Sequence, residues 1–110
     1  MKQGIVAVNQ LFEVTDVFGK RIRSSKQYWE KIRTEKHQEL KYGIGEIKLA
    51  LQKPDSVFRS VKDGTILLYR KKINDDILIV VVKHLNGSGF LVTVYQTKKV
   101  IEKGEKLWPK

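Results

Sequence analysis

The order of apolar and polar residues along the chain predicts strands first and helices after them. The segments "GIVAV" and "LFEVTDV" are rich in β-branched and aromatic residues, and "FGK" supplies a turn before "RIRSS". A loose apolar stripe, typical of a helix, begins after Ser25 and continues to about Lys41. Two glycines then interrupt the pattern, and a second short helix is predicted from Glu46 to Lys53, where Pro54 ends it.

Three further strands complete the predicted fold. The segment "TILLYRKK" ends at the turn "NDD", "ILIVVVKHL" ends at "NGSG", and "FLVTVYQT" runs into a basic tail. The run "ILIVVV" is apolar on both sides, which is typical of a central strand covered on both faces. The sequence therefore predicts one α+β domain over residues 1–110. It consists of an N-terminal β-hairpin, two helices and a three-stranded antiparallel meander, with the helices packed on one face of the sheet.

The charge of the chain indicates a polyanionic partner. Lys and Arg number 22 and Asp and Glu 12, which gives a formal net charge of +10. Such a surface attracts polyanions over about 10 Å in roughly 0.1 M salt. Nucleic acid is the commonest of them, ahead of an anionic membrane surface or an acidic inhibitor protein. No apolar run approaches the roughly 20 residues of a membrane span, and the N-terminus lacks a signal-peptide pattern, so we expect a cytoplasmic protein without a membrane partner.

Several kinds of catalytic site have no support in the sequence. The absence of cysteine excludes disulfides, thiol nucleophiles and cysteine-bound zinc. The chain has no GxxxxGK[ST], GxGxxG, HExxH or GxSxG motif, so neither a cofactor nor a catalytic metal is predicted. Metal-free RNA cleavage needs neither, because the 2′-hydroxyl of the RNA is the nucleophile. The protein then supplies a proton acceptor, a proton donor and cations that stabilise the phosphorane.

Three residues are candidates for these roles. His37 lies near the end of the first predicted helix and can transfer a proton, although the helix dipole alone also favours a histidine there. Arg70 lies near the end of a predicted strand, where a basic residue is often only part of a solvated edge. Lys83 closes the "ILIVVV" run, and a lysine is rarely buried in a central strand without a function. His84, beside the turn, is expected at the surface.

The last strand contributes a polar pair whose neighbours depend on the hairpin register. Thr93 and Tyr95 are two apart in an otherwise apolar segment and therefore share one face. A four-residue loop "NGSG" places His84 on that face, whereas a three-residue loop places Lys83 there. The pattern of the sequence is compatible with both registers.

These segments together resemble a known family. The succession "DVFGKRIRSS…YWEKIRTEKHQEL", "EIKLALQKPDSVFRS", "LLYRKK", "LIVVVKHL", "GFLVTVYQTKK" and "KGEKLW" is similar to the PBECR-type domains of phages and bacteria. These small domains are grouped with the barnase, EndoU, colicin and RelE ribonucleases. The resemblance extends from about Asp16 to Trp108. Its most specific parts are the histidine-containing helix followed by "L-x-x-P-D-x-V", a strand with Tyr-Arg, and "T-x-Y" in the last strand.

The resemblance implies helices packed on a twisted antiparallel sheet whose open face carries the RNA site. His37 matches the family's helical histidine, Arg70 and Lys83 its basic strand residues, and Thr93 and Tyr95 its polar pair. A site that includes Lys83 beside Thr93 and Tyr95 favours the three-residue loop over the four-residue loop. The chain departs from the family in "VTVY", where a small residue is usual between Thr and Tyr, and in "KHQEL", where a proline commonly follows the histidine.

The sequence and the resemblance together predict a toxin-like, metal-independent endoribonuclease that forms 2′,3′-cyclic phosphate ends. The predicted catalytic residues are His37, Arg70, Lys83 and Tyr95. The predicted substrate-binding residues are Thr93, Lys72 and Lys98. The expected partners are RNA and an acidic antitoxin or immunity protein. The alternative is a non-catalytic nucleic-acid-binding or regulatory module that uses the same basic sheet face.

Overall fold

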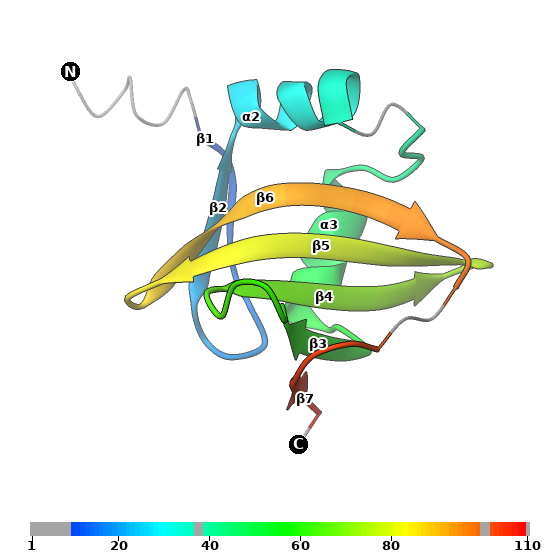
Figure 1. Cartoon of the computed structure of the whole chain (residues 1–110). Coiled ribbons are helices and arrows are strands. Elements are labelled where there is room, and N and C mark those ends of the chain that lie inside the picture. The colour runs from blue at the N-terminus through cyan, green and yellow to red at the C-terminus, as the bar shows by residue number, and fades with distance from the viewer. Residues whose placement is uncertain (1–9, 37–38, 100–101, 110) are drawn as a thin grey trace.

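A single mixed sheet of seven strands forms the body of the protein (Figure 1). The computed structural model describes residues 10–36, 39–99 and 102–109. The strand order is β1-β2-β6-β5-β4-β3-β7, with β2 parallel to β6 and all other neighbours antiparallel. The strands are β1 (Gln10–Thr15), β2 (Arg21–Ser25), β3 (Ser56–Arg59), β4 (Ile66–Ile73), β5 (Asp76–Leu85), β6 (Ser88–Thr97) and β7 (Lys106–Trp108). The helices are α2 (Lys26–Lys31), the π-helical turn Ile32–Lys36 that follows it, and α3 (Ile44–Gln52).

The predicted α+β class, with two helices packed on one face of an antiparallel sheet, is wrong. Strands account for 48% of the structure and helices for 20%, so the sheet dominates and the helices are short. Two strands were not predicted: β3, the four residues "SVFR", and β7, the three residues "KLW". Both are too short to show an alternating pattern, and their neighbours in the sheet rather than their own sequences make them strands.

The first helix is much shorter than the sequence pattern predicts. It begins at Lys26 and is capped by Ser25, whose hydroxyl accepts the backbone N–H of Tyr28 at 3.1 Å. Farther along, where the helix was predicted to continue, side-chain contacts hold the chain beside β6 instead. The Gln96 side chain accepts the Lys41 N–H at 2.8 Å and donates to the Glu39 carbonyl at 3.1 Å. These long-range bonds outweigh the weak helical preference of this segment.

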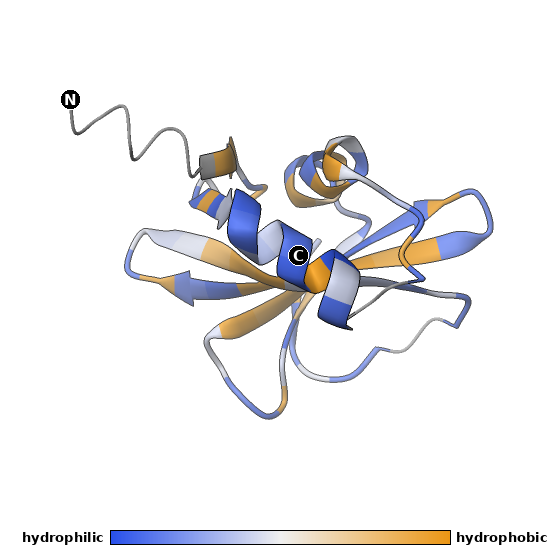
Figure 2. Ribbon diagram, turned by 90° about the horizontal axis from the view of Figure 1, so that it is seen from above, coloured by the Kyte–Doolittle hydropathy of each residue, from blue (hydrophilic) through white to orange (hydrophobic). Residues whose placement is uncertain are grey.

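The main core lies between the sheet and α3. Helix α3 packs against β1, β4 and β5, whereas α2 contacts the β1–β2 hairpin at the side of the sheet. Figure 2 shows hydrophobic residues concentrated in the central strands and on α3, and hydrophilic residues in the loops. The fully buried side chains of this core include Ile22, Ile47, Leu51, Val57, Tyr69, Leu78, Val80, Val82 and Val94. Among the helices of the described residues, none is long and apolar enough to cross a membrane.

The sheet face turned away from this core is called the open face. It carries alternate residues of the central strands, because successive side chains of a strand point to opposite faces. Arg70 on β4 lies opposite Ile79 on β5, which in turn lies opposite Tyr95 on β6. On the other side of Arg70, Ser56 of β3 is its direct neighbour. One lateral row of the open face therefore runs across four strands.

The β5–β6 hairpin settles the register that the sequence left open. Its turn consists of only Asn86 and Gly87, the latter at φ 74°, and is shorter than either loop considered. A β-bulge at Val92 then shifts the pairing by one residue. The combined result places Lys83 rather than His84 on the face of Thr93.

Candidate anion-binding site on the open sheet face

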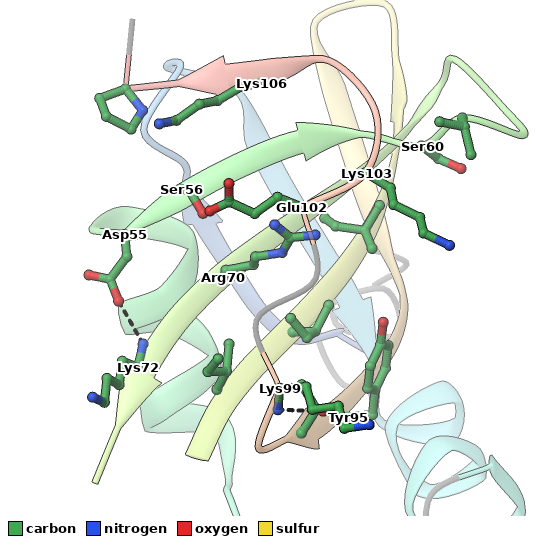
Figure 3. Close-up of a pocket in the computed structure, with 16 residues that line it drawn as sticks. Asp55, Ser56, Ser60, Arg70, Lys72, Tyr95, Lys99, Glu102, Lys103 and Lys106 are labelled. Carbon is green, nitrogen blue, oxygen red and sulfur yellow. Dashed lines mark hydrogen bonds between the residues drawn. The ribbon is translucent and has the colours of Figure 1, made fainter. Parts of the chain in front are cut away.

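A pocket of about 510 Å³ lies on the open face, beneath the segment that leads into β7 (Figure 3). This pocket is called the Arg70 pocket. Its floor is formed by strand side chains, and charged side chains from the C-terminal segment form its rim. The principal lining residues are Ser56, Leu68, Arg70, Lys72, Ile77, Ile79, Tyr95, Thr97, Lys99, Glu102, Lys103 and Lys106.

Arg70 is the distinctive residue of this pocket. It is only 7% exposed, and its guanidinium lies 4.2 Å from the centre of the Phe58 ring. Within the part of the chain that the structure describes, its Nε and Nη1 atoms have no hydrogen-bond partner. Burial lowers the pKa of Arg70, and the nearby Glu102 carboxylate opposes this effect. A buried donor without an acceptor costs about 1–3 kcal/mol, and an anion that accepts from these two atoms would remove this cost.

The electrostatics of the rim reinforce that preference. Four lysine side chains surround the opening: Lys72, Lys99, Lys103 and Lys106. Two carboxylates accompany them, and one of these, Asp55, accepts the backbone N–H of Lys72 at 2.7 Å. The other is Glu102, which lies beside Arg70 in Figure 3. Cations therefore outnumber carboxylates, and the pocket attracts anions.

A glycine allows the C-terminal segment to lie over the pocket. Gly104 has φ +93°, and a Cβ atom there would come within 2.1 Å of the Arg59 carbonyl oxygen. Directly beside it, Arg59 donates its backbone N–H to the Glu105 carbonyl at 2.8 Å. Their side chains also form an ion pair at 3.0 Å. This close approach brings Glu102 and Lys103 to the pocket.

The structure brings together some of the predicted site residues but not all. Arg70, Lys72 and Tyr95 line the pocket. Lys83 and Thr93 lie on the same face but outside the pocket lining. The Lys83 amine is instead 3.7 Å from the Asp63 carboxylate, and the Thr93 hydroxyl is buried without a hydrogen-bond partner among the described residues.

Lys98, predicted to bind substrate, takes part in a different cluster. Its amine lies 3.0 Å from the carboxylate of Asp76, which also accepts from the Tyr42 hydroxyl at 2.6 Å and contacts the Lys41 amine at 3.0 Å. These three partners lower the pKa of Asp76. Lys98 thus lies with Asp76 rather than in the lining of the Arg70 pocket. His37 lies outside the described residues.

The part of the pocket that comes from the C-terminal segment was not predicted from the sequence. Glu102, Lys103 and Lys106 were treated as a basic tail, although the structure returns this segment to the sheet through β7. Ser56 was missed with its strand β3. The available signal was "KGEK", where a glycine between charged residues indicates a turn.

Within the described ranges, no three His, Cys, Asp or Glu side chains are grouped so that they could hold a metal ion. The Arg70 pocket itself supplies fixed cations, the carboxylates of Asp55 and Glu102, and hydroxyl groups. Comparisons with family models, with curated proteins and with solved structures found no match. The resemblance to PBECR-type domains accordingly stays a prediction.

Proposed function

We propose that the Arg70 pocket binds a phosphodiester of RNA and that the protein is a metal-independent endoribonuclease. The observation that carries this proposal is the buried guanidinium of Arg70, with two donors that no described residue satisfies. The ring of lysines and the net charge of +10 favour a polyanion over a small neutral ligand. A phosphate oxygen at Arg70 would receive the two missing hydrogen bonds.

The proposed reaction is attack of the ribose 2′-hydroxyl on the adjacent phosphorus. The bond from O2′ to phosphorus forms, the bond from phosphorus to O5′ breaks, and a 2′,3′-cyclic phosphate remains on one fragment. Glu102 is the carboxylate placed to accept the 2′-hydroxyl proton, and Arg70 stabilises the negative charge of the phosphorane. The leaving O5′ needs a proton, for which Tyr95 in the pocket and the predicted His37 are the candidates.

We also propose the toxin-like role that the sequence predicts. A small basic ribonuclease acting in the cytoplasm would arrest growth, and an acidic antitoxin or immunity protein could neutralise it by covering the lysine rim. Charge supports this setting, because the rim around Arg70 is cationic and an acidic protein surface complements it.

Cleavage of a mixed RNA pool in EDTA tests the proposal. We expect wild type to produce fragments with cyclic phosphate ends. Arg70→Met should reduce the rate by about 10²–10³, as removal of a charge-stabilising donor does. Glu102→Gln should reduce it by about 10²–10⁴, as loss of a general base does. Arg23→Met and Glu30→Gln, which change the same charges at exposed positions outside the pocket, should cleave at the wild-type rate.

A binding measurement with RNA separates the proposal from the non-catalytic alternative. We expect Glu102→Gln to bind RNA at least as tightly as wild type, because a negative charge beside Arg70 is removed, and Arg70→Met to bind it more weakly. If wild type binds RNA in a salt-dependent way but leaves it intact, the binding module is correct and the ribonuclease is not. If Arg70→Met binds and cleaves normally, the pocket is the wrong site. A His37→Ala variant tests the proton role predicted for that residue.

A further inference from the structure

A second polar centre lies at one end of the core face and is separate from the Arg70 pocket. It is a chain of three side chains from three elements: Asp16 from the β1–β2 turn, Tyr69 from β4 and His84 from β5. The Tyr69 hydroxyl contacts the Asp16 carboxylate and lies 2.7 Å from His84 Nε2. The Asp16 side chain has no exposed surface, whereas that of His84 is 13% exposed.

The hydrogen bonds determine where the protons lie. One oxygen of Asp16 accepts the backbone N–H groups of Phe18 at 3.0 Å and Lys20 at 2.8 Å. The other oxygen accepts from Tyr69, whose pKa is raised by burial and by this carboxylate, so that the phenol keeps its proton. Because that single proton points to Asp16, the Tyr69 oxygen must accept the Nε2 proton of His84. Neutral His84 then carries a bare Nδ1.

That nitrogen is open to a ligand. Nδ1 of His84 forms no hydrogen bond to any residue in the described ranges, and it is not among their buried unpaired atoms. His84 lines a pocket of about 710 Å³, called here the His84 pocket. The imidazole therefore presents a hydrogen-bond acceptor to this pocket, and the path through Tyr69 to Asp16 holds the tautomer in place.

The other lining residues define what could bind there. Lys20 and Arg59 supply positive charge that acts on His84, while Phe18, Leu67 and Leu107 supply apolar surface. Lys20 makes no ion pair within the part of the chain that the structure describes. A ligand complementary to these groups has an anionic end, an apolar body and a hydroxyl that can donate to Nδ1.

We propose that the His84 pocket is a second ligand site, which binds a small organic anion of the nucleoside monophosphate type. The phosphate would lie at Lys20, the base against Phe18, and a ribose hydroxyl would donate to Nδ1 of His84. Arg59 would add positive charge at longer range, because its Nε pairs with Glu105 at 3.0 Å and its Nη1 donates to the Gly64 carbonyl at 2.9 Å. This proposal does not rest on the ribonuclease proposal, because the two pockets share no lining residue, although Arg59 of the His84 pocket also pairs with Glu105 of the C-terminal segment.

The test uses adenosine 5′-monophosphate as the probe and side-chain nitrogen NMR as the readout. In the full chain we expect His84 as the Nε2–H tautomer, with an Nδ1 resonance that shifts in a saturable way on addition of the nucleotide. Lys20→Met should weaken binding by about tenfold, as loss of a charged hydrogen bond does. The matched control, Lys31→Met, removes an exposed lysine of α2 and should bind as wild type does.

Variants of His84 and Arg70 show which of the two pockets binds the nucleotide. His84→Gln lacks the reporting nitrogen, so the backbone amide of Lys20 is followed instead, and its saturable shift on addition of the nucleotide should be lost while the surface lysines stay in place. Arg70→Met should leave it unchanged, since that residue belongs to the other pocket. The proposal is overturned if the Nδ1–H tautomer is found, if binding is lost in Arg70→Met, or if no saturable shift occurs. Equal affinity for inorganic phosphate would overturn the organic part of the ligand class.

Discussion

The two polar centres of this protein are both buried, yet they have opposite relations to the fold. The centre at Asp16, Tyr69 and His84 is internally paired, and three donors converge on one carboxylate. The centre at Arg70 leaves two guanidinium donors without a partner among the described residues. Polar groups that satisfy each other stabilise the folded state, whereas an unsatisfied group lowers stability and is available to a ligand. Substitutions at the two centres should therefore change stability in opposite directions.

The largest effect is expected for Asp16→Asn. The variant loses the charge that accepts from Tyr69 and from two backbone N–H groups of the turn, while the residue remains fully buried. We expect the free energy of unfolding to fall by about 1.5–3 kcal/mol, as for a hydrogen bond to a buried charge. Urea denaturation measures this free energy. Asp75→Asn, at an exposed position, is the control. If both variants lose the same free energy of unfolding, the distinction between the two centres is contradicted.

A smaller effect of the opposite sign is expected for Arg70→Met. Methionine fills much of the same volume against Phe58 and removes the two unpaired donors. The free energy of unfolding should rise by about 1 kcal/mol, because an apolar replacement of an unsatisfied buried group stabilises the fold. Urea denaturation measures this rise in the free energy of unfolding. The exposed control Arg23→Met loses the same charge and should not show the rise, which separates the removal of buried donors from a general effect of charge. A loss of stability would show that Arg70 holds the fold together.

The sequence predicts the Arg70 pocket in part, and the reason is periodicity. Strand β4 is long enough for alternation to assign Arg70 and Lys72 to one face. Tyr95 joins that face only through the observed register of β4 with β5 and of β5 with β6. Glu102 could not be placed in this way. Its position depends on Gly104 and on the pairing of a three-residue strand with β3, neither of which leaves a periodic pattern.

The His84 pocket was not predicted, because its residues are far apart in sequence and each has an ordinary local role. Asp16 alone looks like a turn residue, and it does hold that turn through Phe18 and Lys20. Tyr69 looks like one of several buried aromatic side chains. His84 was expected at the surface, and only the antiparallel pairing of β4 with β5 brings it beside Tyr69.

The smallest effect concerns pH and again distinguishes the two centres. The pKa of His84 is lowered, chiefly by burial and further by Lys20 and Arg59, although Asp16 opposes the shift. Protonation therefore favours the unfolded chain, in which histidine has its usual pKa of about 6.5. The stability due to neutral His84 is complete above about pH 6.5 and is lost as the pH falls toward the lower folded-state pKa. Wild type should thus lose stability relative to His84→Gln between about pH 7.5 and about pH 5.5, as thermal unfolding can measure.

Arg70→Met is the matched comparison for this pH series, because arginine does not titrate in that range. The difference in melting temperature between wild type and Arg70→Met should stay constant while the difference between wild type and His84→Gln changes. If both differences are constant, His84 titrates alike in the folded and unfolded chains. The burial of its ring beside Tyr69 would then have no energetic consequence for its proton, and the paired centre would be less rigid than its hydrogen bonds indicate.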